Sequence, residues 1–304
     1  MFFLFVFLIF FFISVLFYFL AILLLVAFLV LLERKFLGLL QIRKGPNIVG
    51  IFRLLQTIID GIKLLLKNFL VSTSNYFFFF SPVFFFILSL FQWIVLPIQV
   101  QYFNISYTIL YTFLLSGLIV YILLWTGWGS NNSFRFIRTI RGIAQIISYE
   151  VVFFFFLIVF IILLRYSSWD SFLSFSGFFI CIFMFIFFLP WLIMVLLELN
   201  RAPFDLVERE SELVSRFNVE FSRFRFTLLF LAEYINIWLL SVITSLIFWG
   251  GFYNMFIFTL LFIIVILWAR GLLPRFKFLD IIFLTWKVYL PGIFFVLFLF
   301  CLSL

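Results

Sequence analysis

The chain has 304 residues, of which 67% are hydrophobic and only 11% are charged, and its formal net charge is +8. A soluble domain carries roughly 25% charged residues, so this composition excludes an ordinary soluble protein. The sequence contains no histidine, which excludes histidine ligation of haem or zinc. Its two cysteines, Cys181 and Cys301, stand alone in apolar runs, without the spacing of an iron–sulfur or zinc site. We therefore expect any metal or flavin centre to lie on another chain.

Uninterrupted apolar runs of about 20 residues predict membrane-spanning helices, because lipid offers the backbone no hydrogen-bond partners. The runs here are continuous rather than alternating in polarity, which favours helices over a β-barrel. The sequence thus predicts an all-α membrane protein, a single polytopic domain over residues 1–304 with eight transmembrane helices. In chain order they are expected near Phe3–Leu32, Phe77–Val100, Tyr107–Thr126, Thr139–Leu164, Phe172–Leu197, Thr227–Phe248, Phe252–Trp268 and Ile281–Leu302. The first would measure roughly 45 Å against a bilayer core of about 30 Å, so we expect it to tilt strongly or to project beyond the bilayer.

Positive charge is distributed very unevenly over this topology. Nineteen of the 20 Lys and Arg residues fall in or beside the charged loops 33–76, 127–138, 198–226 and 269–280, all on one side, and only Arg165 lies on the other. By the positive-inside rule, both termini face the opposite compartment. A basic face can be an orientation signal alone or can also dock a partner, and the acidic residues on the same face favour docking.

The first charged loop contains a segment, residues 51–69, that predicts a helix lying in the membrane interface. Its polar residues follow one another at spacings of 3, 4, 3 and 4, which places them on one helical stripe, and the other positions are largely Leu and Ile. Such a helix would turn its apolar side toward lipid or neighbouring spans. It is either a surface anchor or a helix whose polar stripe lines a site. The stripe consists of Arg53, Gln56, Asp60, Lys63 and Lys67.

Two acids stand inside predicted spans, Glu150 in the fourth and Glu233 in the sixth. A carboxylate in the middle of a bilayer costs roughly 2.5–3.5 kcal/mol on insertion scales. Each acid either makes a hydrogen bond between helices or handles protons in a polar cavity. A carboxyl group that its surroundings can hold neutral or charged can relay protons, and we favour this second interpretation.

The densest polar feature is the segment from Glu198 to Glu220. Such a run is either a solvated loop or, because it is short and dotted with Phe, Leu and Val, a loop folded back on the bundle. Clustered carboxylates repel one another, so we expect some of them to be protonated near neutral pH. Matching cations on the same face would form a basic mouth suited to an amphiphile with a polar head, such as a quinone. The acids are Glu198, Asp205, Glu208, Glu210, Glu212 and Glu220, and the cations are Arg34, Arg43 and Arg201.

Several motifs together resemble the subunit 1 family of respiratory NADH:ubiquinone oxidoreductase (complex I). The resemblance covers essentially the whole chain, and its motifs are long and occur in order. They are Glu33–Gly38, Gln41–Asn47, Asp60–Lys63, Ala144–Val151, Glu198–Asp205, Glu208–Glu220, Ala232–Tyr234 and Pro274–Phe276.

This resemblance implies an eight-helix membrane subunit of the mitochondrial inner membrane, with its charged loops facing the matrix. It implies ubiquinone as substrate, reduced by an iron–sulfur cluster on a neighbouring subunit, and partners among the peripheral quinone-site subunits, the neighbouring membrane-arm subunits and lipid, with no nucleic acid. The implied tunnel residues are Glu33, Arg34, Arg43, Asp60, Lys63, Arg201, Phe204 and Asp205. The implied proton path comprises Glu150, Glu198, Glu208, Glu210, Glu212, Glu220 and Glu233.

The acidic loop departs from the family pattern. Arg209 and Arg216 stand where the family usually has glycine or another small residue, and Phe221–Phe226 replaces small residues and proline. The added arginines would offset much of the loop's negative charge. Arginine is also a poor replacement for glycine where φ is positive. We therefore expect salt bridges such as one from Arg209 to a nearby acid, or contacts to lineage-specific subunits.

Three other classes compete with this interpretation. An ion or solute transporter would often show internal repeats with broken helices, and the chain has no convincing repeat. The membrane subunit of a related hydrogenase would not need a quinone tunnel. A purely structural anchor leaves the intramembrane acids unexplained.

Overall fold

The computed structural model describes residues 2–46, 55–66, 76–97, 106–130, 133–165, 167–174, 178–204, 224–274 and 276–303. Within these ranges every regular element is helical and no strand occurs, which confirms the predicted all-α class. The elements are α1 (Phe2–Leu40), α2 (Gln56–Leu66), α3 (Tyr76–Ile94), α4 (Thr108–Gly129), α5 (Ser133–Leu164), α6 (Trp169–Ser174), α7 (Phe178–Glu198), α9 (Phe224–Phe248), α10 (Phe252–Leu272), α11 (Phe278–Phe283), the π-helical η2 (Leu284–Tyr289) and α12 (Leu290–Ser303).

Seven helical stretches among the described residues are long and apolar enough to cross a membrane. They match seven of the eight predicted spans. The predicted fifth span corresponds to α6 and α7, and only Phe187–Glu198 of α7 is described with its side chains, so this span is not part of the count. The multi-pass architecture is therefore confirmed, and the count of eight stays a prediction.

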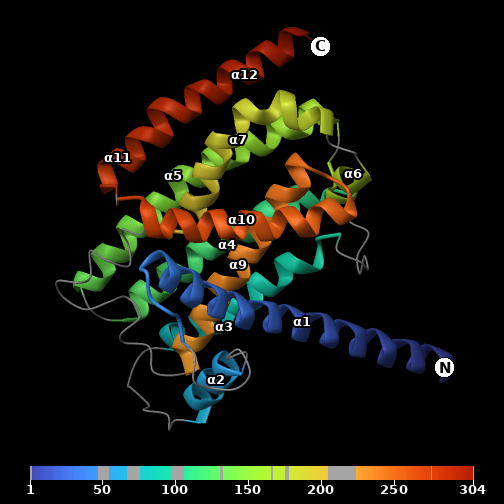
Figure 1. Ribbon diagram of the computed structural model, residues 1–304, viewed down its shortest axis with the longest axis vertical. Helices are drawn as coiled ribbons and strands as arrows, with labels where there is room; N and C mark the ends of the chain where they lie inside the picture. Colours follow the sequence, from blue (N-terminus) through green and yellow to red (C-terminus); the bar gives the residue numbers. More distant parts are fainter. Residues whose placement is uncertain are drawn as a thin grey trace.

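Several helices extend beyond the apolar runs that predicted them. α1 continues to Leu40 rather than ending near Leu32, so Glu33 and Arg34 lie on a helix and not in a loop. Likewise, α5 begins at Ser133 rather than Thr139 and α10 ends at Leu272 rather than Trp268. Backbone hydrogen bonds continue past the apolar edge because no residue there breaks the helix. At 39 residues α1 is about 58 Å long, and its N-terminal part projects from the bundle (Figure 1).

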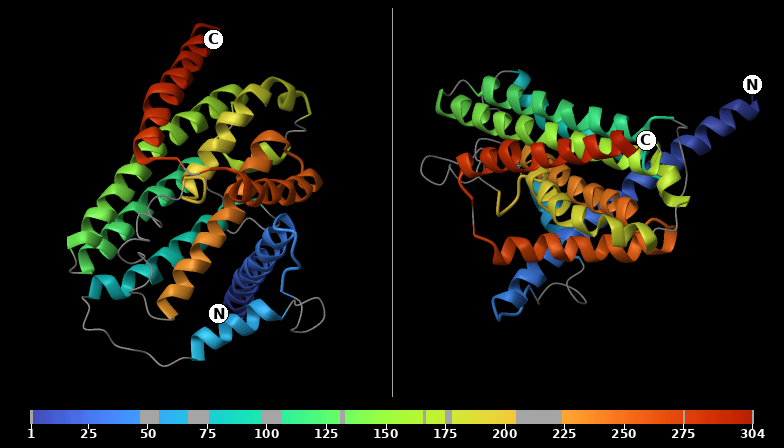
Figure 2. Two further views of the ribbon diagram at one scale, coloured as in Figure 1. Left: turned by 60° about the vertical axis from the view of Figure 1, so that its left-hand side comes forward. Right: turned by 90° about the horizontal axis from the view of Figure 1, so that it is seen from above.

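Helix α9 is at the centre of the bundle. It packs against α1, α3, α6, α7 and α10, and the left view of Figure 2 shows it between α3 and α1. Most of its second half is buried, including the run Trp238–Phe248. A continuous buried helix of this kind forms a wall that the surrounding helices share, and it positions the site described below.

The core where α5, α7 and α9 meet is aromatic. Trp191 of α7 is fully buried and stacks on Phe153 at 5.0 Å between ring centroids. The rings of Phe160 and Phe248 meet it edge to face at 5.4 and 6.4 Å. In contrast, α11, η2 and α12 lie on the outside of the bundle against α5 (Figure 2).

The predicted interfacial helix coincides with α2, and residues 51–54 and 67–69 of that prediction lie outside the described ranges. The side chains of Ile58, Ile59, Ile62 and Leu66 are exposed on one side of α2. Asp60 is less exposed and pairs with α1. This polarity agrees with an interfacial position, which stays a prediction.

Candidate functional site

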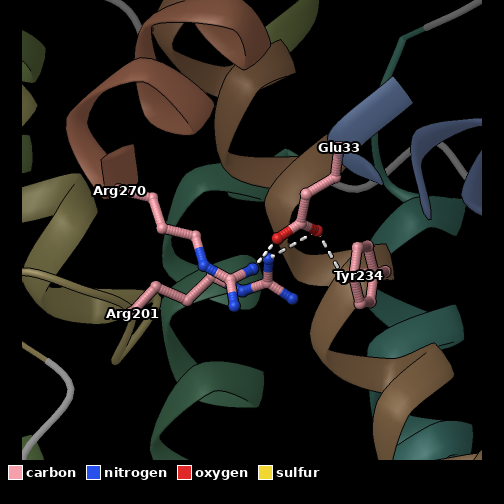
Figure 3. A network of polar contacts seen from close by, with 4 residues as sticks. All are labelled: Glu33, Arg201, Tyr234 and Arg270. Atoms are coloured by element: carbon pink, nitrogen blue, oxygen red, sulfur yellow. Dashed lines mark hydrogen bonds and ion pairs between the residues drawn. The ribbon is translucent and has the colours of Figure 1, made fainter. Parts of the chain in front are cut away.

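A buried carboxylate, Glu33 of α1, contacts polar side chains from three other segments of the chain (Figure 3). Glu33 lies about two turns before the end of α1 and is 3% exposed. Arg201, three residues after α7, donates from Nη1 to Glu33 Oε2 at 3.3 Å. The Tyr234 hydroxyl of α9 donates to the same oxygen, and Arg270 in the last turn of α10 pairs with Oε1. These contacts define the Glu33 cluster: Glu33, Arg201, Tyr234 and Arg270.

The Glu33 cluster combines one carboxylate with two guanidinium groups, so it carries a local excess of one positive charge. The Arg201 guanidinium also lies over the Tyr234 ring, 4.2 Å from its centroid, in a cation–π contact. Buried charges are costly unless each has a partner, and here the carboxylate supplies it for both arginines. The cluster therefore ties α1, α7, α9 and α10 together and leaves cationic donors for a polar ligand.

The next residue of α1 makes a second, more exposed ion pair. Arg34 Nη1 lies 2.9 Å from Asp60 Oδ2 of α2, and the two side chains are 45% and 41% exposed. An exposed pair of this kind contributes at most about 1 kcal/mol. Its consequence is geometric, because it places α2 beside the charged end of α1.

A cavity of about 590 Å³ borders the Glu33 cluster. Along α9 its wall extends from Phe226 to Ile243, a rise of roughly 25 Å. Most of the wall is apolar, with side chains from α1, α3, α4, α5 and α9. Among the described residues, the charged lining consists of three acids and three arginines, whose formal charges cancel when all are ionised: Glu33, Glu198 and Glu233, and Arg34, Arg201 and Arg270.

Two acids near this cavity have buried oxygen atoms without a hydrogen bond from any described residue, Glu198 Oε2 and Glu150 Oε1. Glu198 is the last residue of α7, and Glu150 lies in the middle of α5. The two carboxyl groups are close enough for their charges to repel. Two such acids can share or exchange a proton, because ionising both at once is unfavourable.

The chain that follows α7 is held by side chains of α5. The Tyr149 hydroxyl donates to Asn200 Oδ1 at 2.6 Å, and Gln145 Nε2 donates to the Phe204 carbonyl at 3.3 Å. Phe204 also stacks on Phe276 at 5.3 Å between centroids. These contacts fix the position of Arg201 between two anchored residues.

The predicted site residues divide into three groups. The first lines the cavity and comprises Glu33, Arg34, Glu198, Arg201 and Glu233; Asp60, Glu150 and Phe204 lie close by through the contacts given above. Arg43 and Lys63 are exposed and stand apart from the cavity wall formed by the described residues. The third group lies outside the described residues: Asp205, Glu208, Glu210, Glu212 and Glu220, together with Arg209 and Arg216.

Sequence reasoning missed two members of the Glu33 cluster. Arg270 counted only as one of the topology-setting cations, and Tyr234 stood in a motif without a role. The sequence contained only weak indications that these two residues belong to the site. Arg270 directly follows an apolar run, and Tyr234 is a polar aromatic residue beside an intramembrane acid.

Comparisons with known proteins agree along nearly the whole chain. A family model described as NADH dehydrogenase matches residues 13–301. The chain is 41% identical to NADH-ubiquinone oxidoreductase chain 1 of Patiria pectinifera, over 88% of this chain and 86% of that protein. It is 42% identical to the same protein of Aedes aegypti (88% and 87% covered) and 40% identical to that of Zaedyus pichiy (88% of each). The chain therefore belongs to the NADH-ubiquinone oxidoreductase chain 1 family.

Proposed function

We propose that this chain, as a membrane subunit of NADH:ubiquinone oxidoreductase, forms the entrance and part of the wall of a ubiquinone tunnel. We further propose that its buried acids begin a polar path that couples quinone reduction to proton pumping. Family membership supports the enzyme and a multi-pass position in the inner membrane. The tunnel and the path are inferred from the geometry of the cavity.

One observation carries the quinone proposal: an apolar cavity of about 590 Å³ has the Glu33 cluster on its wall. Pockets for small molecules commonly measure about 300–1,000 Å³ and combine apolar walls with a few placed polar groups. A quinone has two carbonyl acceptors on its head and an apolar tail. Arg201 and Arg270 would donate to the head, and the apolar side chains along α9 would contact the tail.

The entrance is proposed where α2 meets α1. The pair between Arg34 and Asp60 holds α2 with its apolar side chains outward, as a membrane surface would require. Arg43 and Lys63 are exposed, so we assign them to the rim of the entrance. A quinone could then pass from lipid into the cavity along α2, whose apolar side would face lipid and whose polar side faces α1.

The proton path is proposed to start with Glu198, Glu150 and Glu233. Glu198 and Glu150 each have a buried carboxyl oxygen that no described residue hydrogen-bonds, and Glu233 lines the cavity. We also assign to the path the acids of the loop that lie outside the described ranges, Glu208, Glu210, Glu212 and Glu220, and we place Asp205 at the tunnel.

The remaining assignments follow from this proposal. Electrons would come from an iron–sulfur cluster on a neighbouring subunit, so the chain itself would need neither metal nor flavin. Peripheral quinone-site subunits would cover the charged face from the matrix, and membrane-arm subunits and lipid would cover the apolar sides. The family match favours this assignment over the hydrogenase and transporter alternatives.

Neutralising the acids tests the coupling proposal. In the intact complex, Glu150→Gln and Asp205→Asn are expected to lower proton pumping and to slow quinone reduction, because an amide cannot take up or release the proton. The measurements are NADH:quinone turnover and proton translocation in sealed vesicles. Asp280→Asn is the control, since Asp280 is exposed at the start of α11. The proposal would be refuted if both variants kept wild-type turnover and pumping.

A photoreactive ubiquinone analogue tests the tunnel. Crosslinking in the intact complex should label peptides of α1, α9 and α10 that line the cavity, and an excess of ubiquinone should suppress the labelling. Arg270→Met should weaken the labelling at constant analogue concentration, because it removes a donor at the charged end. Labelling that resists competition, or that falls only on outward apolar faces, would contradict a tunnel in this cavity.

A further inference from the structure

Helices α4 and α5 pack antiparallel with a constant register. Phe113 of α4 contacts Phe154 of α5, with ring centroids 4.6 Å apart. One turn further along α4, Gly117 faces Glu150, and near the end of the helix Gly127 faces Thr139. Each step forward on α4 is matched by a step of nearly equal length backward on α5, so these three contacts belong to one continuous interface.

Gly117 leaves the space that the Glu150 carboxyl group occupies. A Cβ atom built at Gly117 would lie 3.0 Å from Glu150 Oε1 and 3.9 Å from its Cδ. The first distance is tighter than most contacts of Cβ atoms in proteins, so a side chain here would shift the carboxyl group by a few tenths of an ångström. Oε1 is buried, and no donor among the described residues bonds it. The carboxyl group therefore packs directly against α4 at Gly117.

The second glycine of the interface gives a useful contrast. At Gly127 the facing group is the Thr139 side chain, and its hydroxyl already donates to the Phe136 carbonyl of its own helix at 2.8 Å. Gly127 thus permits close packing, as small residues do between membrane helices. Gly117 also lets the two helices pack closely, but the group that it faces is the ionisable carboxyl of Glu150, whose Oε1 has no hydrogen bond among the described residues.

We propose that Gly117 is a positioning residue for Glu150, and that the missing side chain forms a slot in α4 that directs the carboxyl group toward its proton partners. The slot leaves Oε1 available to a transient partner such as water or a second carboxyl group. Glu198, whose charge interacts with that of Glu150, is a candidate for this second carboxyl group. This inference rests on the coupling role proposed for Glu150.

The test is a double-mutant cycle in the intact complex. Gly117→Ala is expected to lower the number of protons pumped per electron pair and to slow coupled turnover by about threefold or more. In a Glu150→Asp background the shorter side chain withdraws the carboxyl group from α4. There Gly117→Ala should lower pumping and turnover much less. Gly292→Ala is the matched control, because no described atom lies within 4 Å of a Cβ at this helical position of α12.

The proton-to-electron ratio separates positioning from packing. A packing defect lowers the amount of complex and both rates together, as expected for Gly127→Ala, and leaves the ratio unchanged. If Gly117→Ala lowers turnover at an unchanged ratio, or by the same factor in the wild-type and the Glu150→Asp backgrounds, the inference is overturned. If Gly117→Ala assembles only in the Glu150→Asp background, or in neither background, Gly117 serves helix packing alone and the inference is overturned.

The same cycle distinguishes failure of this inference from failure of the proposed function. Normal pumping in Glu150→Gln alone would remove the proposed role of Glu150. A different result would remove only the role of Gly117. In that case Glu150→Gln impairs pumping, but Gly117→Ala has the same effect with Glu and with Asp at position 150.

Discussion

Replacing Glu33 by glutamine is expected to destabilise the charged end of the bundle by about 3–5 kcal/mol, the usual cost of removing one partner from a buried ion pair. Glu33 is 3% exposed, and the amide keeps its shape while losing its charge. Arg201, whose side chain is 13% exposed, would lose the counter-ion that the described residues give it. Arg270 keeps 35% of its side chain exposed, so water screens it and its share of the cost is smaller.

The measurement is the midpoint of thermal inactivation of the purified complex, together with its assembled yield. Asp60→Asn is the matched control, because it also removes a carboxylate from an arginine, but in a pair that is 45% and 41% exposed. That variant should cost at most about 1 kcal/mol. If the two substitutions lowered the stability of the complex equally, burial of the Glu33 cluster would not determine how much it contributes to that stability.

Replacing Trp191 by alanine is the second change with a large expected effect, again about 3–5 kcal/mol. The indole is fully buried at the meeting point of α5, α7 and α9, where it stacks on Phe153 and touches Phe160 and Phe248. Its loss leaves a cavity that lipid cannot fill, so the lining rings lose their contacts. Because α7 ends at Glu198, we expect the defect to reach Arg201 and to weaken quinone reduction as well as stability.

Trp128→Ala tests whether burial is the cause. Trp128 belongs to α4 and is 68% exposed, so its loss should change stability of the chain by no more than about 0.5 kcal/mol. Thermal inactivation and detergent sensitivity of the complex are the measurements. If Trp191→Ala inactivates no earlier than Trp128→Ala, the aromatic core does not hold α7 in place.

Both predictions concern how the cavity is held open. The Glu33 cluster joins the last turns of α1 and α10 and the chain after α7 to the middle of α9, and the Trp191 core fastens α7 to α5 and α9. Glu198, which lines the cavity, lies in the sequence between Trp191 of the aromatic core and Arg201 of the Glu33 cluster. The acids and arginines that we propose to act on a quinone and on protons are therefore placed by two independent sets of contacts.

Hydropathy alone determined the class of this protein and the position of most spans. The free energy of transferring a helix to lipid depends on about 20 neighbouring residues. It can therefore be summed along the chain without knowledge of the fold. The apolar runs accordingly agree with α3, α4, α5, α9 and α10. The helix ends could not be found in this way, because backbone hydrogen bonds continue into charged sequence, as α1 does through Glu33 and Arg34.

Only the tertiary structure decided which polar residues meet. Glu33 contacts Arg201, Tyr234 and Arg270, partners that lie 168 or more residues away in the sequence, and Gly117 faces Glu150 because of the register between two helices. The sequence by itself identified Glu150 and Arg201 as unusual charges in or near a membrane, and the family resemblance added Glu33. It could not pair them, because the energy of an ion pair depends on separation and burial in space, and packing sets both.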